Sequence, residues 1–264
     1  MAKLREIISV LEKIAPPQYA LSFDNSGLNI GERDSEIKGV TLCLDATESV
    51  IDEAIENGSN LIVSHHPIIF SPIKNLSCDY ENYRAVTKAV KNGINVYSMH
   101  TNLDAAEGGI NDLLASVLGV RNAEILDVVG DNCGIGRVGE TEEITLSALA
   151  EKVEDLLAFP TRIIGKNKDV SVNKIAVVNG SGADLEYLSR AKQMGAQCFI
   201  TSEVKHHIAL FALSIDLPVI ESGHYATERF YIPTLSQKIN DALTKAGYNI
   251  RITVSDKEQN PYLD

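Results

Sequence analysis

The sequence lacks long apolar runs and clusters of positive charge. No uncharged apolar stretch reaches the roughly 20 residues needed to cross a bilayer. The formal net charge is −12, with 24 Lys and Arg against 36 Asp and Glu. This balance argues against nonspecific binding of nucleic acid, which needs concentrated positive charge. A single nucleotide could still bind in a local pocket with metal ions. Glu12 and Lys13 interrupt the apolar residues of the N-terminal segment, so no secretion signal is predicted.

Cysteine is also scarce. The sequence has four cysteines, all far apart and with no CxxC pair: Cys43, Cys78, Cys133 and Cys198. This spacing argues against a disulfide scaffold and a cysteine zinc site, and it predicts reduced, buried thiols in a cytoplasmic protein. The motifs GxxxxGK[ST], GxSxG and HExxH are missing as well.

Short β-branched runs alternate with amphipathic segments along most of the chain. The alternation predicts an α/β fold with mostly parallel sheets. Several helical segments end in a glycine, the usual left-handed stop: Gly58, Gly93 and Gly195. The predicted strands are residues 38–44, 60–64, 94–99, 174–179, 197–201 and 217–222, and the predicted helices include 48–58, 82–93 and 184–196.

The composition of the sequence changes near residues 125–140. The stretch DVVGDNCGIGRVGETEEITL is rich in glycine and acidic residues and interrupts the alternation. We interpret it as the passage into a second, smaller α/β domain. The predicted domains are a discontinuous main domain of residues 1–125 plus 218–264, and an inserted domain of residues 126–217.

Four of the six histidines directly follow predicted strands. Loops at the carboxyl ends of strands in open α/β sheets converge on one crevice, where ligands bind. We therefore expect one edge, near the cleft between the domains, to collect histidines and carboxylates from three segments. Two of these segments repeat a four-residue spacing, one helical turn, between the histidine and the carboxylate. The collected residues are His65, His66, His100, Asp104, His224 and Glu228.

Imidazole and carboxylate together suit zinc, iron, manganese or nickel. A single catalytic zinc uses three protein ligands, which is fewer than the candidates here. Adjacent His65 and His66 also point in different directions from a strand end. The pattern therefore predicts two divalent ions, about 3.5–4 Å apart, with one histidine of the doublet on each and Glu228 as the bridge.

Other residues keep more than one interpretation. His100 could bind a metal directly, or orient Asp104 or a water beside it. His206 and His207 could face a substrate or simply lie on a solvated helix face. VVNGSG could form an anion-binding nest or only a tight turn between strand and helix. Asp24 and Asn25 could line a pocket.

Six motifs, in this order, resemble the Nif-three-like family, also known as GTP cyclohydrolase I type 2. They are FDNSGL, SHHPIIF, HTNLDAAEGGIND, GIGRVG, TSEVKHH and GHYATERF. The resemblance implies a two-domain α/β fold assembled into a ring-shaped homohexamer around dinuclear metal sites. Matched motif by motif, it implies the metal ligands His65, His66, Asp104, His224 and Glu228. His100 then lies beside the ion pair, where it could act as the catalytic acid.

The resemblance also implies a function. It suggests a metal-dependent hydrolase of a nucleotide or related small heterocycle, with GTP ring opening as the family's named activity. The alternative is a non-catalytic metal-binding or scaffold protein whose ring is the functional unit. The enzyme predicts exchangeable water on the metals, whereas the scaffold predicts closed coordination.

Overall fold

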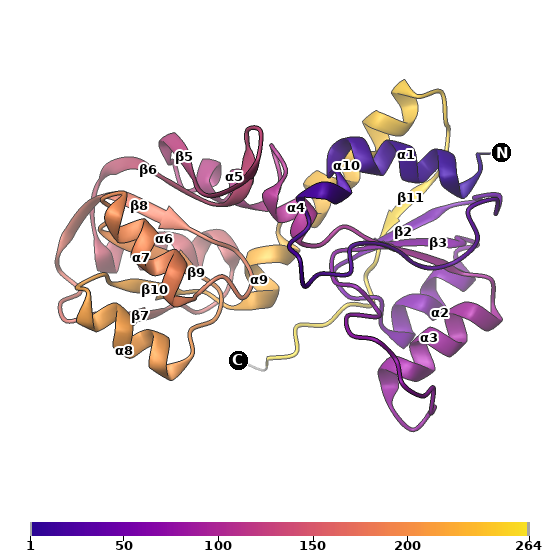
Figure 1. Ribbon diagram of the computed structural model, residues 1–264, viewed down its shortest axis with the longest axis horizontal. Coiled ribbons are helices and arrows are strands. Elements are labelled where there is room, and N and C mark those ends of the chain that lie inside the picture. The colour runs from indigo at the N-terminus through magenta and orange to yellow at the C-terminus, as the bar shows by residue number, and fades with distance from the viewer. Residues whose placement is uncertain (1, 263–264) are drawn as a thin grey trace. The chain divides into compact units, whose positions relative to one another are not determined.

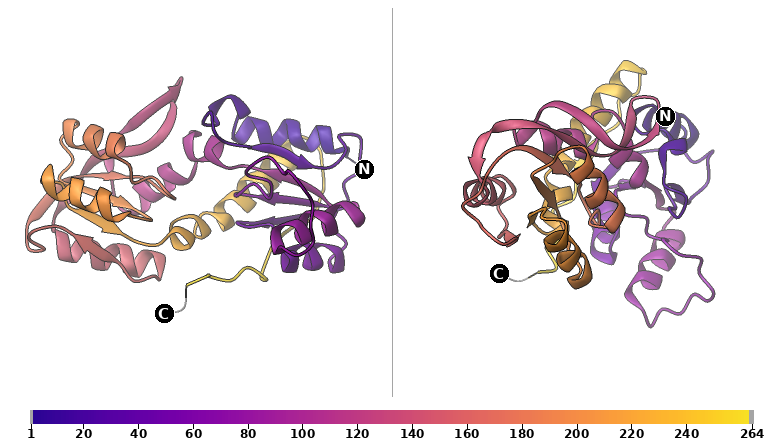
Figure 2. Two further views of the ribbon diagram at one scale, coloured as in Figure 1. Left: turned by 60° about the horizontal axis from the view of Figure 1, so that its bottom comes forward. Right: turned by 60° about the vertical axis from the view of Figure 1, so that its left-hand side comes forward.

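The structure, a computed structural model, describes residues 2–262. It consists of two compact units (Figure 1). The first unit contains the residues up to Ala106 together with those from Ile232 onward, and the second unit contains Glu107–Tyr231. Each unit has its own sheet with helices packed on it (Figure 2).

The sheet of the first unit has five strands in the order β1-β4-β3-β2-β11. Strands β4, β3, β2 and β11 run parallel, and β1 is antiparallel to β4. Every residue of β2, β3 and β4 is buried, as expected for central strands covered on both faces. The strands are β1 (Gly27–Ile30), β2 (Val40–Cys43), β3 (Leu61–Ser64), β4 (Asn95–Ser98) and β11 (Ile252–Val254).

Two helix pairs pack on this sheet. Helices α2 and α3 lie on one face and α1 and α10 on the other (Figures 1 and 2). The apolar sides of α2 and α3 form a core with β2, β3 and β4. The helices are α1 (Leu4–Ile14), α2 (Glu48–Glu56), α3 (Glu81–Lys91), α4 (Thr101–Ala105) and α10 (Ile232–Lys245), with a 3₁₀ helix at Pro17–Tyr19.

The sheet of the second unit has six strands in the order β5-β6-β8-β9-β10-β7. Only the β8–β9 and β9–β10 pairings are parallel, and the other three are antiparallel. The strands are β5 (Arg121–Gly130), β6 (Cys133–Thr145), β7 (Arg162–Ile164), β8 (Ser171–Val177), β9 (Cys198–Thr201) and β10 (Val219–Glu221).

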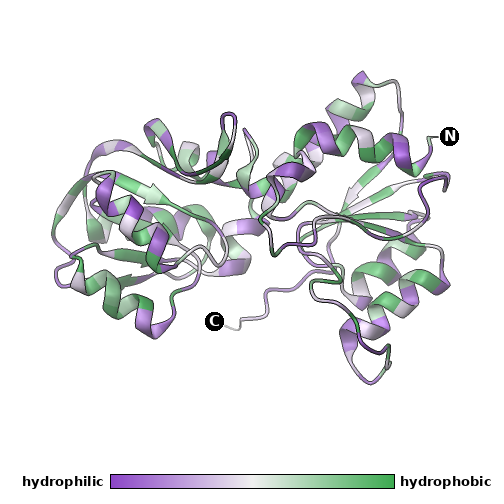
Figure 3. Ribbon diagram, viewed as in Figure 1, coloured by the Kyte–Doolittle hydropathy of each residue, from purple (hydrophilic) through white to green (hydrophobic). Residues whose placement is uncertain are grey.

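The helices of the second unit cover this sheet. Apolar residues of α5 and α6 form one core with β8, β9 and β10. Figure 3 shows hydrophobic residues along the strands, whereas the helices carry both hydrophobic and hydrophilic residues. The helices are α5 (Ile110–Val117), α6 (Leu146–Leu157), α7 (Leu185–Gln193), α8 (His206–Ser214) and α9 (His224–Arg229).

The α/β class and all six predicted strands are confirmed, but the prediction of mostly parallel sheets was wrong, since both sheets are mixed. The three predicted glycine stops are confirmed, each with positive φ: Gly58 at 69°, Gly93 at 64° and Gly195 at 85°.

The glycine-rich stretch near residue 130, which we interpreted as the passage into the second domain, is a β-hairpin within the second compact unit. β5 and β6 pair along this stretch, with Asn132 at a φ of 54° between them. A Cβ at Gly134 would lie 2.0 Å from the carbonyl oxygen of Asp127. One at Gly139 would lie 2.6 Å from the carbonyl oxygen of Arg121. These glycines allow the two strands of the hairpin to approach closely.

The compact units also differ in extent from the predicted domains of residues 1–125 plus 218–264 and 126–217. The second unit begins at Glu107 and ends at Tyr231. β10 belongs to its sheet because Val219 and its neighbours pair with β9 and β7. The chain therefore returns to the first unit at Ile232, after β10 and α9. An apolar strand can fit either sheet, and its sequence does not identify its partner.

Cys43, Cys133 and Cys198 are buried as predicted, and burial raises the pKa of the Cys198 thiol to about 12. Cys78 is exposed, which contradicts the expectation that every cysteine is buried. Within residues 2–262, the helices are too short or too polar to span a membrane.

Candidate metal site

The histidine doublet directly follows β3 in the first unit. The backbone N–H groups of His65 and His66 continue the parallel ladder and donate to Cys43 O and Leu44 O, at 3.1 and 2.9 Å. His65 is fully buried, and the His66 side chain is partly exposed. Their ring centroids lie 5.0 Å apart. The doublet is therefore held rigidly at the carboxyl end of the strand, as predicted.

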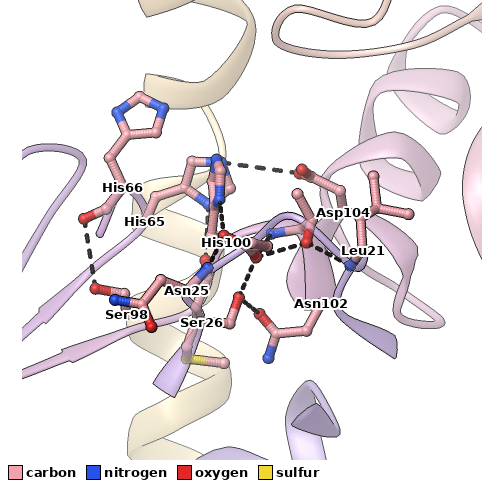
Figure 4. A network of polar contacts seen from close by, with 12 residues as sticks. Leu21, Asn25, Ser26, His65, His66, Ser98, His100, Asn102 and Asp104 are labelled. Atoms are coloured by element: carbon pink, nitrogen blue, oxygen red, sulfur yellow. Dashed lines mark hydrogen bonds and ion pairs between the residues drawn. The ribbon is translucent and has the colours of Figure 1, made fainter. Parts of the chain in front are cut away.

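His100 and Asp104 follow β4, the strand that pairs in parallel with β3. His100 precedes the first residue of the short helix α4, and Asp104 lies one turn further, its N–H donating to His100 O at 3.1 Å. The Asp104 carboxylate lies 3.8 Å from Nε2 of His65 (Figure 4). The predicted helical spacing of this pair is confirmed.

The three imidazoles of the first unit form one cluster. The His100 ring lies 5.2 Å from that of His65 and 5.5 Å from that of His66, measured between centroids. A nitrogen from each ring lies within 4.8 Å of a nitrogen from the other two, a separation at which they could hold a metal ion. The structure thus brings together His65, His66, His100 and Asp104.

Asp24 holds His100 in place. Nδ1 of His100 donates to Oδ1 of Asp24 at 2.6 Å, while Oδ2 accepts from Thr101 N–H and Oγ1 at 3.2 and 2.6 Å. Ser26 Oγ donates to the same Oδ2 at 2.5 Å. Burial alone would raise the pKa of Asp24, but the hydrogen bonds from His100, Ser26 and Thr101 hold it well below its usual range. Asp24 is therefore an ionised, solvent-inaccessible partner of His100.

The remaining two predicted ligands lie in the second unit, on α9. His224 Nε2 lies 3.1 Å from Oε2 of Glu228, one turn along the helix. The helix follows β10, and Gly223 at a φ of 79° starts it beside Phe159. In the second predicted four-residue repeat, His224 and Glu228 therefore face one another.

Gly180 shapes the space beside Glu228. Its φ is 59°, and a Cβ there would lie 2.5 Å from Oε1 of Glu228. The neighbouring Asn179 donates its side-chain N–H to that same oxygen at 3.4 Å. The loop after β8 therefore packs its bare backbone against the carboxylate.

The comparison with known families agrees with this geometry. The family profile described as Duf34/NIF3 (NGG1p interacting factor 3) matches residues 2–261. The chain belongs to this family. It is 35% identical to a GTP cyclohydrolase 1 type 2 homolog of Clostridium acetobutylicum, over 98% of each chain. A homolog of the same name from Clostridium perfringens is also 35% identical, again over 98% of each chain.

A solved Duf34/NIF3 structure confirms the fold. The Bacillus cereus protein related to NIF3 superposes with a TM-score of 0.92 at 26% identity, covering 100% of this chain and 99% of its own.

The donor set of this Duf34/NIF3 chain fits divalent cations, because every candidate histidine is oriented through Nδ1. The acceptors are a carbonyl or carboxylates, so Nδ1 carries the proton and the neutral ring keeps its lone pair on Nε2. This arrangement is typical of metal-binding histidines. The four contacts are His65 to Met99 O at 2.8 Å, His66 to Asp45 at 2.9 Å, His100 to Asp24 at 2.6 Å and His224 to Glu203 at 3.1 Å.

The contact between His224 and Glu228 also fits a bound cation. With its proton on Nδ1, neutral His224 directs the Nε2 lone pair toward the Glu228 carboxylate. Two electron-rich atoms 3.1 Å apart repel unless positive charge is present. A metal ion or an imidazolium proton would supply that charge.

The sequence interpretation did not identify the residues that orient the histidines in this Duf34/NIF3 chain. Asp45 immediately follows the predicted strand 38–44, and Glu203 lies in TSEVKHH. Both therefore also lie after strands, a signal that we applied to histidines alone. Asp24 was predicted only as a pocket residue, and the structure shows its role with His100.

Two weaker predictions can now be placed. His206 and His207 are the first two residues of α8 and are exposed, as expected for a solvated face. VVNGSG forms a turn after β8, and α7 begins at Leu185 with Asp184 as its N-cap. Ser181 in this turn donates to Glu203 at 2.9 Å, which ties the turn to the carboxylate that orients His224.

Proposed function

We propose that the chain is a dinuclear metal-dependent hydrolase acting on a nucleotide or related small heterocycle. His65, His66 and Asp104 of the first unit and His224 and Glu228 of the second would hold the two ions, with Glu228 as the bridge. The proposal rests chiefly on the shared orientation of the histidines through Nδ1. The relatives' name, GTP cyclohydrolase 1 type 2 homolog, supports opening of a purine ring as the reaction.

Bound divalent ions would lower the pKa of water and polarise the substrate at neutral pH. The chain supplies the precise placement of the donors. Met99 and Asp45 fix the two rings of the doublet at one strand end. Glu203 fixes His224, and the bare Gly180 backbone packs beside the proposed bridging carboxylate. Pre-orientation removes the entropy cost of ordering these groups during each turnover.

His100 is the proposed acid and base. Its Nδ1–H is held by ionised Asp24, so Nε2 is the atom that exchanges protons with the substrate. The carboxylate stabilises the imidazolium formed when His100 accepts a proton, and it keeps the ring in one tautomer. Opening a purine ring between C8 and a ring nitrogen needs a proton on the departing nitrogen, and His100 would deliver it.

The test is turnover by protein loaded separately with manganese, iron, zinc or nickel. Hydrolysis of one C8–N bond opens the ring and leaves C8 as a formamide, and a second water cleaves the other C–N bond and releases C8 as formate. A coupled assay measures the formate. We expect formate from the wild-type protein and at least about 100-fold less from His100→Ala, the usual contribution of a general acid. Retention of bound metal without turnover of any nucleotide would favour the non-catalytic ring protein instead.

A further inference from the structure

Two exposed aromatic rings lie beside the histidine cluster of the first unit. Phe23 is 63% exposed and Phe70 is 49% exposed. Their centroids are 6.4 Å apart, and the Phe70 ring stands edge-on to His100 at 6.0 Å. Single exposed apolar side chains are common, but a pair in contact with each other and with a candidate catalytic imidazole is a distinct feature.

The pair is built from two segments that are firmly tied together. Phe70 follows SHHPII, and Phe23 lies on the loop before β1. Asn25 donates its side-chain N–H to Ile69 O at 2.6 Å, which joins the two segments one and two residues from the rings. The side chain of Asp24, directly after Phe23, is solvent-inaccessible and accepts five hydrogen bonds. The backbone that displays Phe23 is therefore fixed.

We propose that Phe23 and Phe70 bind the planar aromatic ring of the substrate, a purine-class heterocycle, beside His100. This inference rests on the proposed function and deepens it by assigning where the ring binds. Aromatic side chains stack on any nucleobase, because every base presents a flat π-face. The polar part of the same ligand would then face the imidazoles and carboxylates. Two rings form a surface far smaller than the area of a stable protein interface, which favours a small ligand over a protein partner.

The experiment separates ring binding from turnover and from metal binding. The probes are 7-deaza-GTP, which keeps the planar ring but lacks the C8–N7 bond, and inorganic tripolyphosphate, which has no ring. Binding to metal-loaded protein is measured by isothermal titration calorimetry. The variants are Phe23→Ala, Phe70→Ala and Phe70→Trp. The matched control is Tyr80→Ala, because Tyr80 is 66% exposed and its ring stands edge-on to Tyr83.

We expect Phe23→Ala and Phe70→Ala each to weaken 7-deaza-GTP binding about tenfold or more, leaving tripolyphosphate binding and metal content unchanged. Phe70→Trp should restore ring binding, and Tyr80→Ala should bind both probes as wild type. Unchanged 7-deaza-GTP binding in both alanine variants would overturn the inference. The inference would also be overturned if the alanine variants lost affinity for tripolyphosphate as much as for 7-deaza-GTP, or if their assembly mass changed. It would be overturned too if the wild-type protein bound 7-deaza-GTP no more tightly than tripolyphosphate.

The inference and the proposed function can fail separately. Ring binding that depends on both phenylalanines, without turnover of any nucleotide, would support the inference and contradict the hydrolase. Formate release with the same KM in the alanine variants as in wild type would support the hydrolase and contradict the inference.

Discussion

Nε2 of His224 lies 3.1 Å from Oε2 of Glu228, one helical turn along α9. The opposite ring nitrogen donates to Glu203 at 3.1 Å. The imidazole therefore lies between two carboxylates, one that orients it and one proposed to share a metal with it. Three of our predictions concern this arrangement.

Removal of the Glu203 carboxylate should weaken metal binding. Glu203→Ala removes the acceptor of the His224 Nδ1–H, so we expect metal affinity to fall about 10- to 100-fold. Glu203→Gln keeps a carbonyl acceptor and should lose less. Affinity is measured by competition with a chromophoric chelator. Glu186→Ala, in the same unit but paired with Arg190, is the control. Equal affinity in Glu203→Ala and wild type would contradict the orienting role.

Truncation of Glu228 should remove metal and thermal stability together. An ion that binds only the folded chain stabilises it by about 2.7 kcal/mol at 100 times its Kd. The wild-type protein should therefore have a higher Tm with metal than with chelator. The Tm of Glu228→Ala should be the same in both conditions. Both values come from calorimetry, alongside elemental analysis. A metal content equal to wild type would contradict the bridging role.

A methyl group at Gly180 should displace Glu228. Gly180→Ala places a Cβ 2.5 Å from the carboxylate oxygen and also strains a φ of 59°. The matched control is Gly58→Ala, where φ is 69° and no atom lies within 4 Å of the added Cβ. Both variants should lose about 1–2 kcal/mol of stability in urea unfolding of the metal-free protein. Only Gly180→Ala should also lose metal affinity; a similar loss in Gly58→Ala would exclude the steric explanation.

Asp24 should make the stability of the metal-free protein depend on pH. Its pKa is held below the unfolded value of about 3.9, so its contribution is present above that value and is lost as pH falls through the lower folded pKa. Asp24→Asn should cost about 1–3 kcal/mol near neutral pH. The difference from wild type should shrink below about pH 4 in urea titrations.

The control for Asp24 is Asp34→Asn. Asp34 is an exposed residue of the same unit, paired with Lys3 and Arg5, and its replacement should change stability by less than about 0.5 kcal/mol at any pH. A wild-type to Asp24→Asn difference that stays constant from pH 7 to pH 3 would contradict the assignment of Asp24 as an ionised partner of His100.

Local patterns predicted much of the candidate site and of the fold. The four-residue spacing of His224 and Glu228 predicted a facing pair, and that of His100 and Asp104 predicted the backbone turn between them, because helix geometry is local. Short β-branched runs predicted six strands, because strand preference also depends on neighbouring residues in the sequence.

The errors arose where a residue's role depends on distant neighbours. Gly134 and Gly139 are required by the carbonyls of the facing strand, which the sequence does not show. Val219 pairs with β9 and β7 through backbone groups that every residue has, so its sheet could not be predicted. Asp24 contacts His100 across 76 residues, and no spacing rule covers such a distance.

The central claim is that two divalent ions bind at these histidines and carboxylates. The most direct test of this claim is anomalous scattering from crystals of protein that was never exposed to a chelator. We predict two peaks about 3.5–4 Å apart, one at Nε2 of His65 and one at Nε2 of His66, with the Glu228 carboxylate between them. Crystals without an anomalous peak at these nitrogens would contradict the account.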